Sequence, residues 1–259
     1  MDSLLDFTDK TILITGAGSG FGAALSCALA ARGATLILAD INAAGLDETV
    51  TKVKAFGTEV AMLVGNVADE LHAKALVDLA QNQFGRLDFA VNNAGVAPNM
   101  APIHQTLSEV LDLQLNVNVK GVAFGMKYQL PAITEAGGGA ILNVSSMAGI
   151  GGAPMASSYA AAKHAVIGLT KTGACEFGGK NVRVNAICPF FSQTPMVLES
   201  DAIKSGTVEE ANSKLAQGCP MKRIAELDEI VNVMVMMLSP QNTYMNGVAI
   251  AVDGGMSAM

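Results

Sequence analysis

Short apolar runs rich in β-branched residues alternate along the chain with longer amphipathic stretches. The runs are apolar throughout, which is typical of strands buried on both faces of a parallel sheet. The repeated order of strand and helix predicts an α/β Rossmann fold, a doubly wound parallel sheet of about seven strands with helices on both faces. Strands are predicted at 11–15, 35–39, 60–64, 87–91, 140–144, 182–187 and 248–252, and helices at about 20–32, 43–56, 69–84, 106–135, 157–177 and 226–238.

Several residues mark the expected helix ends. Thr106 and Glu109 have the spacing of a capping box, in which the two side chains satisfy backbone N–H groups at the start of a helix. Asn42 and Asp69 are expected N-caps, because their side chains accept hydrogen bonds from the first helical N–H groups. Gly85 follows a predicted helix, where a left-handed residue is favoured.

The composition is that of a folded chain without an internal boundary. Of the 259 residues, 51% are hydrophobic and 15% are charged, which excludes intrinsic disorder. No composition break, low-complexity linker or repeat divides the chain, so residues 1–259 are expected to form one domain. The segment at about 190–218 is longer and less patterned than the other connections, and we expect it to form a lid over a site.

The charge balance and the cysteines exclude several classes of protein. Sixteen Lys and Arg against 23 Asp and Glu give a formal charge of −7, and an acidic chain without a basic run is a poor ligand for nucleic acid. Four cysteines without a C-x-x-C pair indicate free thiols in a reducing, cytoplasmic compartment. The acidic N-terminus is unlike a signal peptide. The uncharged stretches 11–31 and 136–162 are interrupted by glycines and polar residues, so no membrane partner is expected.

The three histidines do not form a metal-binding pattern. His72, His104 and His164 lie far apart in the sequence, without a neighbouring Cys cluster, so no metal site is expected. Each is predicted to lie on a helix surface or in a loop. The low fraction of charged residues leaves much apolar surface to cover, which favours a homo-oligomer.

A glycine-rich turn follows the first predicted strand and opens the first helix. In Thr15-Gly-Ala-Gly-Ser-Gly-Phe-Gly22 the glycines allow the backbone to approach a pyrophosphate, which the helix N-terminus attracts. Asp40 ends the second strand eighteen residues after Gly22. An acid at this distance accepts hydrogen bonds from the adenosine ribose and repels a 2′-phosphate, which favours NAD over NADP. The alternative is that Asp40 simply ends a strand as a turn residue.

Tyr159 and Lys163 form a candidate acid–base pair. They are four residues apart and therefore lie on one face of a helix, with Ser157 and Ser158 as candidates for its N-cap. A tyrosine has a pKa of about 10, and both an ammonium group and a helix N-terminus favour the phenolate. The alternative is an ordinary exposed helix pair.

Ser146 is a candidate for binding a substrate oxygen. It lies thirteen residues before Tyr159 and directly follows the fifth predicted strand, and ligands of open α/β sheets bind at the carboxyl ends of strands. The neighbouring Ser145 is an alternative for this role.

Jointly these features resemble the short-chain dehydrogenase/reductase family, and the resemblance runs nearly end to end. The length and the glycine spacing are similar to the shorter, single-domain branch of the family. The matching motifs are Thr15-Gly-x-x-x-Gly20-x-Gly22, Asn92-Asn93-Ala94-Gly95, Asn118 three residues before Gly121, Ser146, Tyr159-x-x-x-Lys163, Pro189 followed by Thr194, and Asp253-Gly254-Gly255.

The resemblance implies roles for individual residues. Tyr159 would be the general acid/base, Lys163 would lower its pKa and hold the nicotinamide ribose, Ser146 would polarise the substrate oxygen, and Asn118 would hold a water of a proton relay. Thr194 would bind the nicotinamide carboxamide. The cofactor contacts it implies are Gly16, Ser19, Gly20, Phe21, Gly22, Asp40, Ile41, Asn66, Val67, Asn93, Ala94, Gly95, Tyr159, Lys163, Pro189, Ser192 and Thr194, with Asn93 nearest the cofactor in its stretch.

Two positions depart from the family's pattern. Many members have Asp where this chain has Asn66, beside Val67, at the adenine, and the amide can still hydrogen-bond. Phe190 stands where members often have glycine after the proline. Its ring is expected to narrow the substrate site or to change the contact with the nicotinamide.

The sequence thus predicts an NAD-dependent dehydrogenase that interconverts a hydrophobic secondary alcohol and its ketone. The alternatives are a 3-oxoacyl-thioester reductase, which usually uses NADPH and basic residues where this chain has Asp40, and an inert NAD-binding scaffold. Relatives pair the helices at 106–135 and 157–177 across a dimer axis, which implies a homotetramer, with a dimer as the alternative. Apolar pockets select apolar ligands, and the residues expected above the nicotinamide are Met147, Ile150, Met155, Phe190, Phe191, Met196, Val197 and Leu198.

Overall fold

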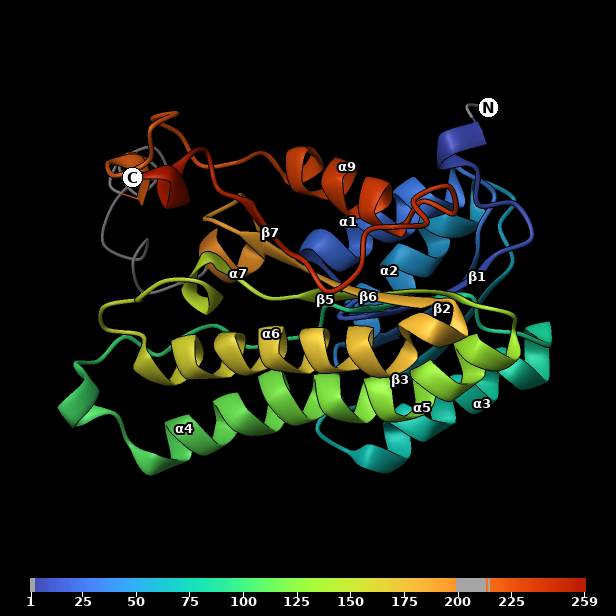
Figure 1. The fold of residues 1–259 in the computed structure, drawn as a ribbon, viewed down its shortest axis with the longest axis horizontal. Coiled ribbons are helices and arrows are strands. Elements are labelled where there is room, and N and C mark those ends of the chain that lie inside the picture. The colour runs from blue at the N-terminus through green and yellow to red at the C-terminus, as the bar shows by residue number, and fades with distance from the viewer. Residues whose placement is uncertain (1–2, 199–212, 214) are drawn as a thin grey trace.

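The computed structural model describes residues 3–198, 213 and 215–259, and in it seven parallel strands form one sheet (Figure 1). The strand order is β3-β2-β1-β4-β5-β6-β7. This confirms the doubly wound α/β fold predicted from the hydrophobic pattern. The strands are β1 (Thr11–Thr15), β2 (Thr35–Asp40), β3 (Val60–Val64), β4 (Phe89–Asn92), β5 (Gly139–Val144), β6 (Val182–Pro189) and β7 (Ala249–Val252).

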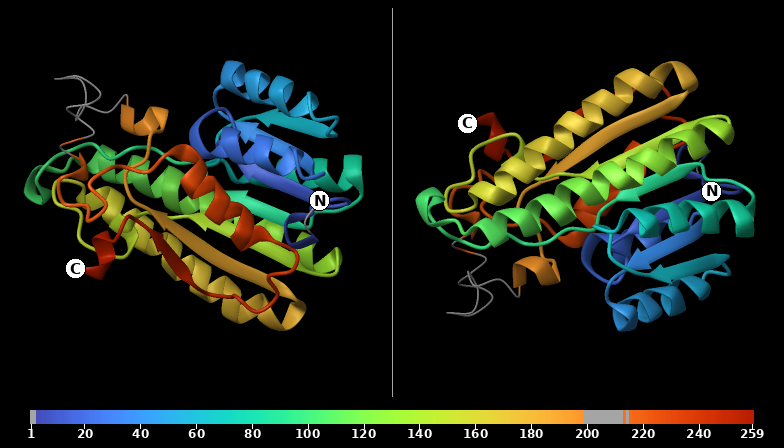
Figure 2. Two further views of the ribbon diagram at one scale, coloured as in Figure 1. Left: turned by 90° about the horizontal axis from the view of Figure 1, so that it is seen from above. Right: turned by 90° about the horizontal axis from the view of Figure 1, so that it is seen from below.

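Helices cover both faces of the sheet (Figures 1 and 2). One face carries α1 (Gly20–Ala30), α2 (Ala43–Lys54) and α9 (Leu227–Leu238), and the other carries α3 (Glu70–Phe84), α5 (Gly121–Glu135) and α6 (Ser157–Phe177). The shorter helix α4 (Ser108–Gln114) lies beside α6 in the second of these layers, and the short helix α7 (Pro195–Leu198) follows β6. Five 3-10 helices complete the described elements: Ser3–Leu5, Ile103–Gln105, Met147–Gly149, Gly178–Lys180 and Met256–Ala258.

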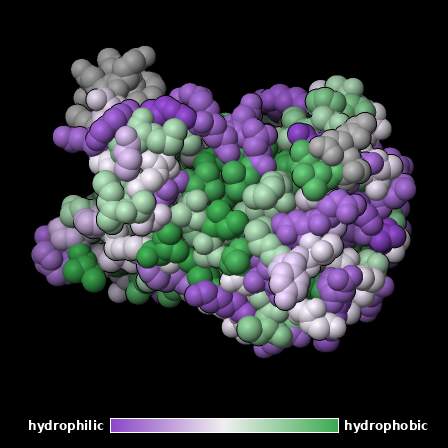
Figure 3. All heavy atoms as spheres, turned by 45° about the horizontal axis from the view of Figure 1, so that its top comes forward, coloured by the Kyte–Doolittle hydropathy of each residue, from purple (hydrophilic) through white to green (hydrophobic). Residues whose placement is uncertain are grey.

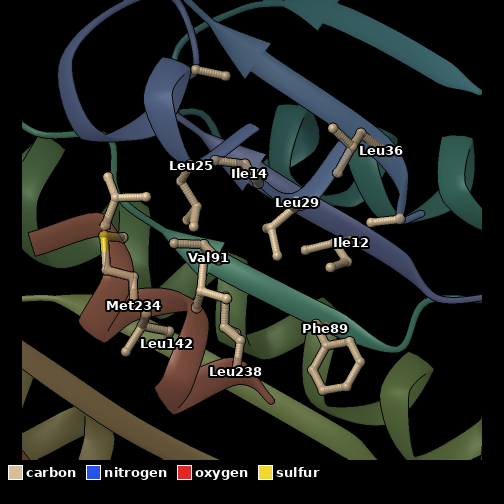
Figure 4. Packing of buried hydrophobic residues seen from close by; sticks show 14 of the residues in the cluster. Ile12, Ile14, Leu25, Leu29, Leu36, Phe89, Val91, Leu142, Met234 and Leu238 are labelled. Atoms are coloured by element: carbon tan, nitrogen blue, oxygen red, sulfur yellow. The ribbon is translucent and has the colours of Figure 1, made fainter. Parts of the chain in front are cut away.

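The larger core cluster fills the space between the sheet and the layer of α1, α2 and α9 (Figure 4). Leu25 and Leu29 of α1 reach the side chains of β1, and Met234 and Leu238 of α9 pack beside Val91 and Leu142. Burying an aliphatic side chain of this size stabilises the fold by about 1.5–3 kcal/mol. The core therefore fixes α1, and with it the turn that precedes it, on the sheet.

The helix predicted at 106–135 is divided into three parts. α4 ends at Gln114, a π-helix spans Leu115–Lys120, and α5 begins at Gly121. The predicted capping box is wrong, because the N-cap of α4 is Leu107 and the Thr106 hydroxyl pairs instead with the Ser157 hydroxyl at 3.1 Å. Periodicity over 30 residues could not detect a single π-turn, since one extra residue in a turn hardly changes the apolar pattern.

Some of the other local predictions are confirmed and others are wrong. Asn42 and Asp69 are confirmed as N-caps of α2 and α3, and Gly85 follows α3 with a φ of 74°. Neither Ser157 nor Ser158 caps α6, whose N-cap is Ala156. The edge strands β3 and β7 are partly exposed, unlike the inner strands, because each has a neighbour on one side only.

Two features of the described residues bear on function. None of their helices is long and apolar enough to cross a membrane. Residues 199–212 and 214 of the predicted lid lie outside the described part of the chain. The described part includes α7 and the residues from 215 onwards.

Candidate active site

The candidate residues gather at the carboxyl edge of the sheet. Thr15 ends β1, Asp40 ends β2, Asn92 ends β4 and Val144 ends β5. β1 and β4 are adjacent, although β4 follows β3 in the sequence, so the strand order reverses between them. Ligands of open α/β sheets bind at such a switch point. The glycine turn after β1 and the Asn93–Gly95 stretch after β4 lie on its two sides.

The glycine turn is closely packed against its own backbone. Gly16 has a φ of +66°, a conformation that L side chains rarely adopt. A Cβ on Gly22 would lie 2.1 Å from the carbonyl oxygen of Gly16. Asn93 supports the turn, since its Nδ2 donates to the carbonyl oxygens of Thr15 and Gly16 at 2.9 and 3.0 Å. The sequence predicted Asn93 as a cofactor neighbour, and the structure adds that its amide holds the turn in place.

Asp40 closes the other side of this turn. Its Oδ2 accepts a hydrogen bond from the backbone N–H of Gly18 at 2.8 Å, and its Oδ1 accepts one from the N–H of Asn42, also at 2.8 Å. A Cβ on Gly18 would lie 2.9 Å from the carboxyl carbon. Asp40 is therefore more than a strand-ending residue, because its carboxylate is fixed against the glycine turn. Ile41 beside it is exposed.

Tyr159, Ser146 and Lys163 come together as the sequence predicted. The Ser146 side chain lies close enough to Tyr159 to influence the pKa of its hydroxyl, and the Ser146 Oγ accepts from the backbone N–H of Ala148 at 3.2 Å. The Lys163 Nζ lies 5.6 Å from the centre of the Tyr159 ring. The same ammonium group donates to the carbonyl oxygen of Val144 at 2.8 Å, which fixes Lys163 at the end of β5.

Burial controls the pKa values of this pair. It raises the pKa of Tyr159 above its ordinary value, and the neighbouring Ser146 hydroxyl opposes this shift. It lowers the pKa of Lys163 to about 8. Desolvation disfavours the charged forms of both side chains, so in this structure burial opposes the effect expected of the ammonium group and the helix N-terminus.

The structure distinguishes Ser146 from Ser145. The buried Ser145 hydroxyl donates to the backbone carbonyl oxygen of Lys163 at 2.9 Å. A Cβ on Gly149 would lie 2.3 Å from the Ser145 oxygen, so little space remains around it. Ser145 thus connects the end of β5 to α6, and Ser146 is the serine that contacts Tyr159.

Asn118 lies in the π-helix that separates α4 from α5. Its Oδ1 accepts from the N–H of Val96 at 3.0 Å, and its Nδ2 donates to the carbonyl oxygen of Val96 and to the side chain of Gln114. The side-chain amide therefore connects the π-helix to the loop after β4. π-turns recur at functional sites, and a water at Asn118 would bind to its backbone, because its side chain is engaged.

Gln114 is a site residue that sequence reasoning missed. Its side chain is buried, and its Nε2 donates to the carbonyl oxygen of Ala97 at 2.7 Å. Gln114 binds Ala97, Asn118 binds Val96, and the two side chains are hydrogen-bonded to each other. They therefore hold the loop after β4 at two consecutive residues. A glutamine four residues before Asn118 was the available signal, but only the fold shows that both reach this loop.

Three of the remaining predicted contacts lie where β6 ends. Pro189 is the last residue of β6, and the buried Ser192 and Thr194 follow it. A Cβ on Gly20 would lie 3.7 Å from the Thr194 side chain, so Thr194 faces the start of α1. The rings of Phe190 and Phe191 form an edge-to-face pair with centres 4.8 Å apart. Asn66 and Val67 lie in the turn between β3 and α3.

The chemistry of these groups is proton transfer beside a nucleotide turn. Among residues 3–198, 213 and 215–259, no group of three or more His, Cys, Asp or Glu residues could hold a metal ion. A tyrosine with a serine and a lysine nearby is suited to moving a proton to or from a substrate oxygen.

Comparison with known proteins gives the family. A family model described as "Enoyl-(Acyl carrier protein) reductase" matches residues 16–257. The chain belongs to the short-chain dehydrogenase/reductase family. It is 38% identical to levodione reductase of Leifsonia aquatica, over 97% of this chain and 96% of that protein. It is 36% identical to cyclohexanol dehydrogenase of Acinetobacter sp. (strain SE19), over 96% and 95% of the two chains.

A solved structure agrees with this assignment. The structure of carveol dehydrogenase from Mycobacterium avium in complex with NAD superimposes with a TM-score of 0.93 and 29% identity, covering 97% of this chain and 99% of the other. The protein is thus an oxidoreductase of the short-chain dehydrogenase/reductase family, and the family resemblance predicted from its motifs is confirmed.

Proposed function

We propose that this protein is an NAD-dependent dehydrogenase that interconverts a hydrophobic secondary alcohol and its ketone. The observation that carries the proposal is the contact of Ser146 with Tyr159 above Lys163, at the same sheet edge as the glycine turn. The three side chains come from the end of β5 and the start of α6, and the turn comes from β1.

The glycine turn fits a dinucleotide. Close packing between Gly16, Gly22 and Asn93 leaves no space for side chains, and the first N–H groups of α1 are available to a pyrophosphate. Asp40 would bind the adenosine ribose, Asn66 and Val67 the adenine, and Lys163 the nicotinamide ribose. The remaining proposed contacts are Ser19, Gly20, Phe21, Ile41, Ala94, Gly95, Pro189, Ser192 and Thr194. Bound NAD would supply the acceptor or donor of the hydride.

The proton moves through the chain's own residues. In the direction of reduction, the Tyr159 hydroxyl donates its proton to the carbonyl oxygen, and in the direction of oxidation it recovers a proton from the substrate hydroxyl. Ser146 would orient the same substrate oxygen. The ammonium group of Lys163 favours the phenolate when that proton leaves. A water bound by the backbone of Asn118 would connect this pair to solvent.

The proposed substrate is apolar and cyclic. The rings of Phe190 and Phe191 pack against each other in the loop after β6. Met147, Ile150 and Met155 follow β5. No lysine or arginine stands among these residues to bind a carboxylate or phosphate, and methionine side chains adapt to several shapes. The similarity to levodione reductase, cyclohexanol dehydrogenase and carveol dehydrogenase supports a cyclic ketone or alcohol.

A 3-oxoacyl-thioester reductase is the second candidate, because the chain is also 37% identical to a 3-oxoacyl-[acyl-carrier-protein] reductase of Thermotoga maritima, over 95% of this chain and 97% of that protein. Against it, the carboxylate of Asp40 lies against the glycine turn, where it would repel the 2′-phosphate of NADPH. An inert NAD-binding scaffold is the third candidate, but Asn118, Ser146, Tyr159 and Lys163 are all present.

One experiment separates the three candidates. Purified protein is assayed with cyclic alcohols, cyclic ketones, linear polyols and acetoacetyl thioesters, each with NAD(H) and NADP(H). We expect turnover of cyclic substrates with NAD(H). Preferred turnover of the thioester with NADPH would establish the second candidate, and NADH binding without turnover of any substrate would support the third.

A further inference from the structure

His72 lies inside the protein, where the sequence predicted a surface position. It belongs to the first turn of α3, and only 8% of the residue is exposed. Burial lowers its pKa, while the charge of Asp69 opposes this shift. Neutral His72 is therefore the form present at pH 7. Such deep burial of an imidazole is unusual, because buried polar groups normally have hydrogen-bond partners.

The ring of His72 packs directly against Gly65. A Cβ on Gly65 would lie 2.3 Å from Nδ1 and 2.4 Å from Cε1 of the ring, which is too close for any side chain at position 65. The N–H of Gly65 donates to the carbonyl oxygen of Asp40 at 3.0 Å. The backbone of Gly65 is thus held between the end of β2 and the imidazole.

Gly65 begins the turn that leads to Asn66 and Val67. The other end of this turn contacts α5, because a Cβ on Gly121 would lie 2.8 Å from Cγ2 of Val67. Between the two contacts, the Asn66 Oδ1 accepts from the N–H of Ala68 at 3.0 Å, and Asn66 itself is exposed. The position of this exposed residue therefore depends on the supports at both ends of the turn.

His72 is also one of the residues that line a small, mainly apolar cavity. Nε2 is buried and has no hydrogen-bond partner among the described residues. The cavity has a volume of about 10 Å³, and its walls include Thr15, Asn92 and Gln129.

We propose that His72 is a positioning residue for the adenine end of the cofactor, through its contact with Gly65. The inference rests on the proposed function, in which Asn66 and Val67 contact the adenine. Loss of the ring would let the turn move and weaken NAD binding. It would leave the proton transfer unchanged, because Tyr159 belongs to α6 and not to this turn.

A pair of substitutions tests the contact. His72→Ala should raise the KM for NAD and the Kd for NADH about tenfold, with kcat at saturating NAD within about twofold of the unchanged protein. Gly65→Ala should impair binding more strongly, because its Cβ overlaps the ring. In the double variant Gly65→Ala/His72→Ala the new methyl group occupies the space left by the ring. Its Kd for NADH should then fall to within about threefold of that of His72→Ala.

Three controls make the result decisive. Leu71→Ala, at an exposed neighbour on α3, should leave NAD binding unchanged. His72→Gln, whose amide reaches the region of Nε2, should retain most of the affinity. Thermal unfolding identifies variants that are not folded, and the double variant still tests the contact if Gly65→Ala alone fails to fold.

The outcomes separate the inference from the proposed function. Equal NADH binding by His72→Ala and the unchanged protein would overturn the inference alone, as would equal effects of Gly65→Ala in both backgrounds. A fall in kcat without a change in KM for NAD would also overturn it. An unchanged protein that binds no NADH would overturn the proposed function as well.

Discussion

The carboxylate of Asp40 accepts a hydrogen bond from the backbone N–H of Gly18 at 2.8 Å. This contact places a negative charge directly against the turn that is proposed to hold the cofactor pyrophosphate. The same carboxylate would bind the ribose hydroxyls of NAD and repel the 2′-phosphate of NADP.

Replacing Asp40 should therefore change the coenzyme preference. We expect Asp40→Ala to lower kcat/KM for NAD(H) about tenfold and to raise it for NADP(H), because both the attraction and the repulsion are lost. Asp47→Asn, an exposed acid on α2, is the matched control and should leave the preference intact. A protein that uses NADP(H) equally well before any substitution would contradict the prediction.

Tyr159→Phe should abolish most of the activity. The substitution keeps the ring and removes the hydroxyl that Ser146 contacts. General acid–base catalysis contributes about 10²–10⁴ to rates, so kcat should fall at least about a hundredfold while NADH binding is retained. Tyr128→Phe is the control, because the Tyr128 hydroxyl donates to Glu70 at 2.9 Å, away from the site. Near-normal turnover by Tyr159→Phe would rule out the assigned role.

Lys163 should make the folded protein more stable as the pH rises above about 8. The folded pKa of about 8 lies below the ordinary lysine value of 10.5, so in this window the unfolded chain binds the additional proton and the free energy of unfolding rises with pH. Above pH 10 the raised pKa of Tyr159 acts in the opposite direction, because the folded state then retains the proton.

The measurement compares urea unfolding of the unchanged protein and of Lys163→Met at about pH 7.5 and 9.5. The gain in stability between the two pH values should be smaller in the variant. Identical gains would show that burial of Lys163 does not shift its pKa.

The apolar surface of α4 and the loop before it should be an interface between copies of the chain. Leu107, Leu111 and Leu113 are exposed there, as is Leu115 at the start of the π-helix that follows. A further apolar area, bordered by hydrophilic residues, occupies the face in Figure 3. Exposed apolar areas of this kind usually mark protein contacts, and two of them are consistent with the proposed tetramer.

Leu107→Lys/Leu111→Lys should reduce the assembly to a smaller species in sedimentation experiments at micromolar concentration. Leu71→Lys introduces the same charge at an exposed leucine of α3 and should leave the mass unchanged. A monomeric mass for the unsubstituted protein would refute the prediction.

Phe190 should limit the size of the substrate. Its ring contacts that of Phe191 edge to face, so Phe190→Ala should open the site and raise kcat/KM for bulkier cyclic ketones by about tenfold or less. Phe56→Ala, at an exposed ring near the end of α2, is the control. An unchanged substrate profile, or a best substrate that is a polyol, a sugar or an anionic acid, would contradict the proposal.

The sequence by itself determined the fold class and most of the candidate site. Uniformly apolar runs defined the strands because inner strands of a parallel sheet are buried on both faces. The glycine turn, Asp40, Ser146 and the Tyr159–Lys163 spacing were local signals, since each depends on neighbouring residues in one strand, turn or helix.

Only the tertiary structure decided which polar groups meet and how deeply they are buried. In the structure, the Ser145 hydroxyl donates to the backbone of Lys163, and Ser146 lies beside Tyr159. The structure also places His72 against Gly65. These relationships join residues from different elements, and pKa values depend on desolvation by all of them. A linear pattern records spacing along one element, whereas contact and burial arise only when the elements pack together.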